Sequence, residues 1–143
     1  MALSGQLAGA VQLPDGTWIR GRGLRNPPPG GPDPDFGLYL GVDYTPGWAH
    51  ERIDWPDFRL PRDSRGAAVL LRRAYDVARG GGRVEVACRG GRGRTGTALA
   101  AISILAGNPP ADAVAWVRSH YDSHAVETVW QRRWVRRFPG LLG

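Results

Sequence analysis

The sequence predicts an α/β fold: a central, largely parallel sheet flanked by helices on both faces, with an N-terminal β-hairpin. Two observations predict it. Short apolar segments with strand character alternate with segments whose apolar residues recur at helical spacing, an order typical of strand–helix–strand units. Strands joined through a helix run parallel in one sheet. The 143 residues suffice for an ordinary core, and we expect one domain over residues 1–143.

The N-terminal part supplies the hairpin and two strands. Residues 11–22 alternate around a Pro-Asp-Gly turn, which is typical of a β-hairpin. Residues 25–35 are rich in proline and glycine, so we expect a loop there. The mostly apolar residues 36–42 form the next predicted strand, and residues 51–56 form another, which ends at a proline.

From Asp63 onward the apolar spacing becomes helical. Apolar residues three and four apart indicate a first helix, which the stretch RGGG at 79–82 ends; they are Ala67, Leu70, Leu71, Ala74 and Ala78. The stretch RVEVAC at 83–88 predicts a strand, and residues 94–107 predict a helix. In such sheets ligands bind beyond the carboxyl ends of the strands, and Cys88 stands at such an end.

Two further helices complete the pattern. Asn108 has the side chain of an N-cap and Pro109 suits a first helical position, so we expect a helix from there to about His120. Residues 126–138 form the last predicted helix. Its aromatic residues recur every fourth position and are expected to pack inward, while its arginines face solvent; they are Trp130, Trp134 and Phe138.

Composition and charge exclude several classes of protein. The net charge of +6 comes from arginine alone, which reflects either a bias of the genome or a partner that carries anionic groups. The single cysteine, Cys88, excludes an intramolecular disulfide and a zinc site built on several thiolates. No apolar run approaches the ~20 residues of a membrane span, and no signal peptide is recognisable. We expect a cytoplasmic protein with no stable membrane association and no nucleic-acid partner.

The loop that follows residues 83–88 has the composition of an anion site. Glycine tolerates the backbone conformations in which successive N–H groups turn inward, and the N-terminus of the next helix adds its dipole. Arg94 can hold a phosphate-sized dianion through two parallel hydrogen bonds. The same field favours a thiolate at Cys88, which makes this cysteine an activated nucleophile. The candidate binding residues are Arg89, Gly90, Gly91, Arg92, Gly93 and Arg94.

The stretch CRGGRGRTG resembles the C-x5-R-[ST] signature of the cysteine-dependent protein tyrosine and dual-specificity phosphatases. The upstream stretch DWPDF is similar to the W-P-D loop of that family. The resemblance implies a phosphatase-like fold, a nucleophile at Cys88, phosphate binding by Arg94 and a general acid at Asp57. It also implies that Thr95 hydrogen-bonds the sulfur and that Gln131 orients the hydrolytic water. No metal or cofactor is required.

The sequence departs from the family at two places. Ala87 precedes the cysteine where members usually have histidine. Glu85 lies on the same face of the strand and is the candidate to replace that histidine, with a loop arginine as its expected partner; alternatively it is solvated near a sheet edge. Arg89 and Arg92 occupy positions where phosphoinositide phosphatases of the superfamily carry basic residues.

The expected function is hydrolysis of a phosphomonoester by a protein tyrosine or dual-specificity phosphatase that forms a phosphocysteine intermediate. Its partner would be a phosphorylated protein or another phosphomonoester. A phosphoinositide or inositol-phosphate phosphatase is the alternative with the same chemistry, and a phosphate-recognition pseudophosphatase is the non-enzymatic one. A sulfurtransferase or arsenate reductase also uses a cysteine loop, but it gives the W-P-D stretch no purpose, and the chain has no second cysteine to resolve a disulfide.

Overall fold

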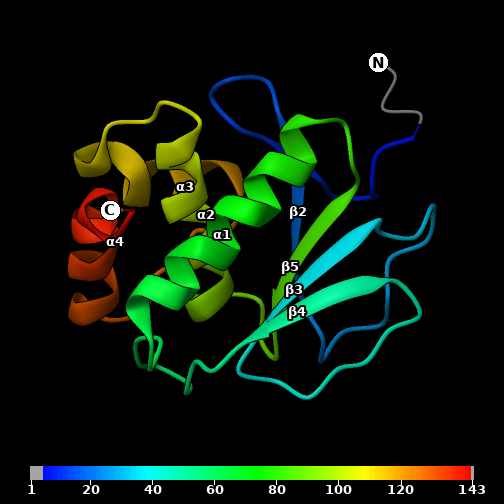
Figure 1. Ribbon diagram of the computed structural model, residues 1–143, viewed down its shortest axis with the longest axis horizontal. Helices are drawn as coiled ribbons and strands as arrows, with labels where there is room; N and C mark the ends of the chain where they lie inside the picture. Colours follow the sequence, from blue (N-terminus) through cyan, green and yellow to red (C-terminus); the bar gives the residue numbers. More distant parts are fainter. Residues whose placement is uncertain (1–4, 143) are drawn as a thin grey trace.

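A computed structural model of the chain describes residues 5–142 (Figure 1). Its strands are β1 (Val11–Gln12), β2 (Trp18–Gly23), β3 (Phe36–Leu40), β4 (Ala49–Ile53) and β5 (Val84–Cys88). Its helices are α1 (Ser64–Arg79), α2 (Gly93–Leu105), the short 3-10 helix η1 (Pro110–Asp112), α3 (Ala113–His120) and α4 (Val129–Leu141).

The strands form one sheet in the order β1-β2-β5-β3-β4. β1 and β2 pair antiparallel as a hairpin, whereas β2, β5, β3 and β4 all run parallel. β5 is paired on both sides, and all five of its residues are buried. The predicted α/β class, the largely parallel sheet and the N-terminal hairpin are therefore confirmed, and the carboxyl end of the central strand is Cys88.

The helices gather on one face of the sheet, a difference from the expectation that they flank both (Figure 1). Val84, Val86 and Cys88 face these helices and belong to the hydrophobic core, while Glu85 and Ala87 face the other way. The difference arises because the parallel strands β2, β3 and β4 are joined by loops rather than by helices. The second face is instead met by polar contacts from the N-terminal segment and from the β3–β4 loop.

Local capping explains where the helices begin. Asp63 caps α1, because its side chain accepts a hydrogen bond from the Gly66 N–H at 3.0 Å. The prediction that Asn108 caps a helix is wrong, since its side chain turns back to donate to Ser103 Oγ at 3.2 Å and the helix starts only at Ala113, after η1. Within residues 5–142, no helix is both long and apolar enough to cross a membrane.

The last helix begins three residues later than predicted because Thr128 caps it. The Thr128 hydroxyl accepts from the Gln131 N–H at 3.1 Å, and the Gln131 amide oxygen accepts from the Thr128 N–H at 3.3 Å, which completes a capping box. Trp134 and Phe138 are buried as expected, but Trp130 is 52% exposed. The inward packing predicted for all three aromatic residues therefore holds for two of them.

Candidate active site

The loop between β5 and α2 packs directly on the end of β2. The Leu24 N–H donates to the Cys88 carbonyl at 2.9 Å, so the pairing with β5 continues past Gly23, the last residue of β2. Gly91 has a φ of 75°, and a Cβ at this position would lie 2.4 Å from the Gly23 nitrogen. Only glycine fits both the left-handed backbone and this close approach, so the glycine run shapes the loop through contact as well as through flexibility.

The Cys88 sulfur is buried and hydrogen-bonded at the floor of this loop. It accepts from the Gly91 N–H at 3.2 Å and from the Thr95 hydroxyl at 3.0 Å. α2 begins at Gly93, so the sulfur lies near the positive end of the helix dipole. The two donors and the helix dipole therefore all direct positive charge at the sulfur.

A cavity of about 300 Å³ opens over the sulfur. Besides Cys88, it is lined by five of the six residues predicted to bind substrate, namely Arg89, Gly90, Arg92, Gly93 and Arg94; Gly91 is not among its lining residues. Asp57 lines it too, together with residues that the sequence did not single out, namely Arg25, Asn26, Phe58 and Glu127. Four arginines thus face two carboxylates around one sulfur, an environment that suits an anionic ligand.

Arg94 is held over the cavity by protein contacts on one side of its guanidinium. Its Nη1 donates to the Trp55 carbonyl at 3.1 Å, and its Nη2 lies 3.5 Å from Asp57 Oδ1. Gly41 makes room for this arrangement, because a Cβ there would lie 2.5 Å from the Arg94 Nη1. The buried Nε of Arg94 has no hydrogen-bond partner among residues 5–142. A buried donor without a partner is costly, and an anion in the cavity would satisfy it.

Asp57 lies on a loop whose base is buried and whose tip is strained. Trp55 is fully buried, and its indole N–H donates to the Arg59 carbonyl at 2.7 Å. Phe58 adopts a φ of 60°, which is unusual for a residue with a side chain, and its N–H donates to Asp57 Oδ1 at 3.0 Å. The Asp57 carboxylate is therefore oriented by its own loop while remaining largely open to solvent.

The start of α4 holds this loop from outside. The Trp130 indole N–H donates to the Phe58 carbonyl at 2.6 Å, and the Gln131 amide nitrogen donates to the Arg59 carbonyl at 3.3 Å. The oxygen of the same Gln131 amide accepts from the Glu127 and Thr128 N–H groups. Gln131 is fully buried and does not line the cavity, so the structure does not bring it to the place where a hydrolytic water would act.

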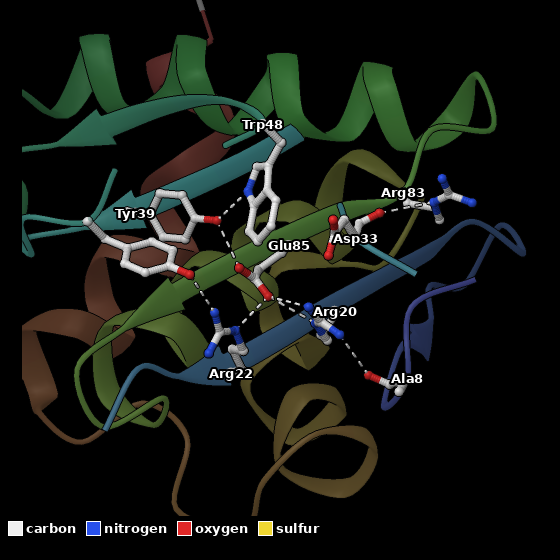
Figure 2. Close-up of polar contacts among 9 residues, drawn as sticks. Ala8, Arg20, Arg22, Asp33, Tyr39, Trp48, Arg83 and Glu85 are labelled. Atoms are coloured by element: carbon white, nitrogen blue, oxygen red, sulfur yellow. Dashed lines mark hydrogen bonds and ion pairs between the residues drawn. The ribbon is translucent and has the colours of Figure 1, made fainter. Parts of the chain in front are cut away.

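Glu85 is the centre of a buried polar cluster on the sheet face that carries no helices (Figure 2). Its Oε1 accepts from Arg20 Nη2 at 2.6 Å and from Arg22 Nε at 2.7 Å, while its Oε2 accepts from the Tyr39 hydroxyl at 2.8 Å. The Trp48 indole donates to that hydroxyl at 2.8 Å. The partners of Glu85 are therefore arginines of β2 rather than of the loop, and burial together with the Glu85 charge raises the pKa of Tyr39.

Tyr121, just beyond α3, supports the loop from the helix side. Its hydroxyl donates to the Gly91 carbonyl, and its ring packs so closely that a Cβ on Gly21 would lie 2.7 Å from it. Burial and the Cys88 charge raise the pKa of Tyr121, which keeps the hydroxyl protonated as a donor. Because a trans peptide directs its N–H opposite to its carbonyl, this bond turns the Arg92 N–H away from Tyr121. No sequence pattern indicated this contact.

Comparison with protein families identifies the same part of the chain. A family model described as "Polymorphic toxin system, DSP-PTPase phosphatase" matches residues 37–108, just over half of the chain, from β3 through α2. None of the curated proteins matches the chain in sequence.

Solved phosphatase structures share the fold. The active form of Tk-PTP is 26% identical, with 76% of this chain and 80% of that chain covered and a TM-score of 0.66. Kinase associated phosphatase is 15% identical, with 74% and 69% covered and a TM-score of 0.62. PTPMT1 in complex with PI(5)P is 19% identical, with 73% and 77% covered and a TM-score of 0.54. The last two likenesses concern the fold alone.

Proposed function

Because the chain belongs to the DSP-PTPase phosphatase family of polymorphic toxin systems, and so is a cysteine-based phosphatase, we propose that it hydrolyses phosphomonoesters through a phosphocysteine at Cys88. The observation that carries this proposal is that the hydrogen-bonded Cys88 sulfur and the guanidinium of Arg94, whose buried Nε has no partner among residues 5–142, line one cavity. A phosphate dianion bound there would satisfy the Arg94 donor and bring phosphorus to the sulfur.

In the first step the Cys88 thiolate attacks phosphorus, an S–P bond forms and the P–O ester bond breaks. Asp57 gives its proton to the leaving oxygen, so that the departing group is an alcohol or phenol rather than an anion. Arg94 and the loop amides of residues 89–94 neutralise the transferring phosphoryl group. The 3.5 Å separation between Arg94 and Asp57 keeps acid and anion-binding group together at one end of the cavity.

In the second step Asp57 takes a proton from water, the water oxygen attacks phosphorus and the S–P bond breaks. The sulfur leaves as a thiolate, which Thr95 stabilises through its 3.0 Å hydrogen bond. We assign Gln131 to positioning the Asp57 loop rather than to placing this water, because both ends of its amide are engaged elsewhere. The chemistry requires a reduced thiol, which supports a cytoplasmic location.

We infer that the substrate is a phosphorylated protein, as expected for a protein tyrosine or dual-specificity phosphatase. Phe58 lines the cavity and is 52% exposed, so its ring is available to pack on a phosphorylated side chain. A phosphoinositide or inositol phosphate is the second candidate, favoured by the observation that Arg89 and Arg92 both line the cavity.

Hydrolysis of p-nitrophenyl phosphate and phenyl phosphate by three variants tests the mechanism. Cys88→Ser should abolish turnover of both esters. Asp57→Asn should flatten the alkaline limb of the pH profile, and should slow phenyl phosphate more than p-nitrophenyl phosphate, because p-nitrophenolate leaves without a proton. Glu127→Gln is the matched comparison, since Glu127 is the other carboxylate of the cavity. Loss of the alkaline limb in Glu127→Gln instead would move the acid role to that residue, and turnover by Cys88→Ser would contradict the nucleophile.

A further inference from the structure

We propose that Arg25 and Arg89 form a second anion site beside the Cys88 cavity, and that the preferred substrate carries a second phosphate group on the same molecule. This inference rests on the proposed function of the Cys88 site, because the second group is recognised while the first is hydrolysed. It concerns which phosphomonoesters the site selects, whatever their scaffold.

Backbone pairing holds the two arginines next to each other. The Arg25 N–H donates to the Arg89 carbonyl at 2.9 Å, one step beyond the bond from Leu24 to Cys88. Both residues therefore stand at the carboxyl end of the parallel strands, immediately beside the nucleophile. Positive charges on neighbouring segments repel each other, and an anion bound against both guanidiniums would offset that repulsion.

Neither guanidinium is neutralised by the protein itself. Among residues 5–142, the side chains of Arg25 and Arg89 form no hydrogen bond or ion pair, and both are exposed. Arg52 in the same region differs, because Asp43 neutralises it through a direct ion pair. The uncompensated positive charge at this edge of the sheet therefore belongs to Arg25 and Arg89.

The two arginines border two adjoining cavities. They line the Cys88 cavity, and they also line a second cavity of about 380 Å³ that extends toward Tyr44 and Arg52. A substrate whose phosphate enters the Cys88 cavity and whose body runs over this rim places its next anionic group against both guanidiniums. Two guanidiniums can each bind a phosphate with paired hydrogen bonds, which a phosphate monoester accepts through its three free oxygens.

Matched pairs of substrates test the second site. One pair is a peptide with a single phosphotyrosine and the same peptide with an added phosphothreonine two residues away. The other is a soluble phosphatidylinositol monophosphate and the corresponding bisphosphate. We expect wild type to show a kcat/KM about 10-fold higher for the doubly phosphorylated member of at least one pair, as charge-assisted hydrogen bonds imply, and the pair that shows it identifies the source of the second phosphate. This preference should weaken as salt is added.

Arg25→Ala should bring that ratio close to one, whereas Arg65→Ala, which removes the same charge from an exposed position on α1, should leave it unchanged. Equal turnover of both members of each pair by wild type would overturn the second site alone, as would a ratio that survives in Arg25→Ala. Absence of turnover for every substrate would overturn the proposed function and the second site together.

Discussion

Replacement of Glu85 by glutamine isolates the charge at the centre of the buried cluster. The amide has nearly the shape of the carboxylate, so packing is preserved while the negative charge is lost. Arg20 and Arg22 have side chains only 4% and 8% exposed, and Glu85 is fully buried between them. Glu85→Gln would leave two buried guanidiniums without a counter-charge, a change that costs about 3–5 kcal/mol.

Urea unfolding measures this cost. With a slope of about 2 kcal/mol per molar urea for a chain of this size, the midpoint of Glu85→Gln should fall by about 2 M. The matched control is Glu51→Gln, which removes the same charge from an exposed ion pair with Arg73 at 3.0 Å and should cost less than about 1 kcal/mol. If both variants lose similar stability, the cluster is not held by its charge and the reasoning is refuted.

Three further variants test the loop, the Asp57 segment and the hairpin. Tyr121→Phe removes only the hydroxyl that holds the Gly91 carbonyl, and should lower kcat/KM for p-nitrophenyl phosphate about 5- to 10-fold. It should also change the rate at which iodoacetamide alkylates Cys88, and an unchanged rate would assign Tyr121 a packing role only. Trp130→Phe removes the hydrogen bond to the Phe58 carbonyl and should reduce kcat for phenyl phosphate, while inhibition by vanadate persists. Weaker inhibition by vanadate would instead show that Trp130 supports anion binding. Burial alone would raise the pKa of Asp15, but hydrogen bonds from Tyr75 and Thr17 lower it to about 2. The resulting stability, about 1 kcal/mol after solvent screening of this exposed residue, is present above the ordinary pKa of 3.8 and is lost as pH falls toward 2. The difference in unfolding free energy between wild type and Asp15→Asn should therefore shrink over that range, and a constant difference would contradict the assignment.

The fold could be predicted where local signals and tertiary packing agree. α1 has a capping aspartate at Asp63, small residues at helical spacing and a glycine stop, and the structure places it within a residue of the prediction. The start of α3 could not be predicted. The Asn108 side chain can cap the next helix or hydrogen-bond Ser103 of the previous one, and the sequence does not indicate that it does the latter. All the helices lie on one face of the sheet because loops, not helices, connect the parallel strands β2, β3 and β4. The spacing of apolar residues in a sequence does not indicate the path of such loops.

The proposed nucleophile, its arginine and the proposed general acid could be predicted from the sequence because each lies in a short contiguous motif. For Gln131 the family resemblance implies a role in placing water, whereas the Thr-Val-Trp-Gln run at 128–131 has the spacing of a capping box. The partners of Glu85 were missed because they depend on the register of β2 against β5, which sets Arg20 opposite Glu85. Glu127 precedes α4, far from the signature loop in the sequence, and only the folding of the chain brings it to the cavity. Contacts between residues of different strands and helices could therefore be identified only from the structure.

Acid quenching during turnover of p-nitrophenyl phosphate, followed by mass spectrometry of the peptide that contains Cys88, tests the covalent mechanism most directly. We predict one phosphoryl group on that peptide in wild type, more of it in Asp57→Asn, where water is activated poorly, and none in Cys88→Ser. Release of phosphate while the Cys88 peptide stays unmodified at every quench time would contradict nucleophilic attack by this sulfur.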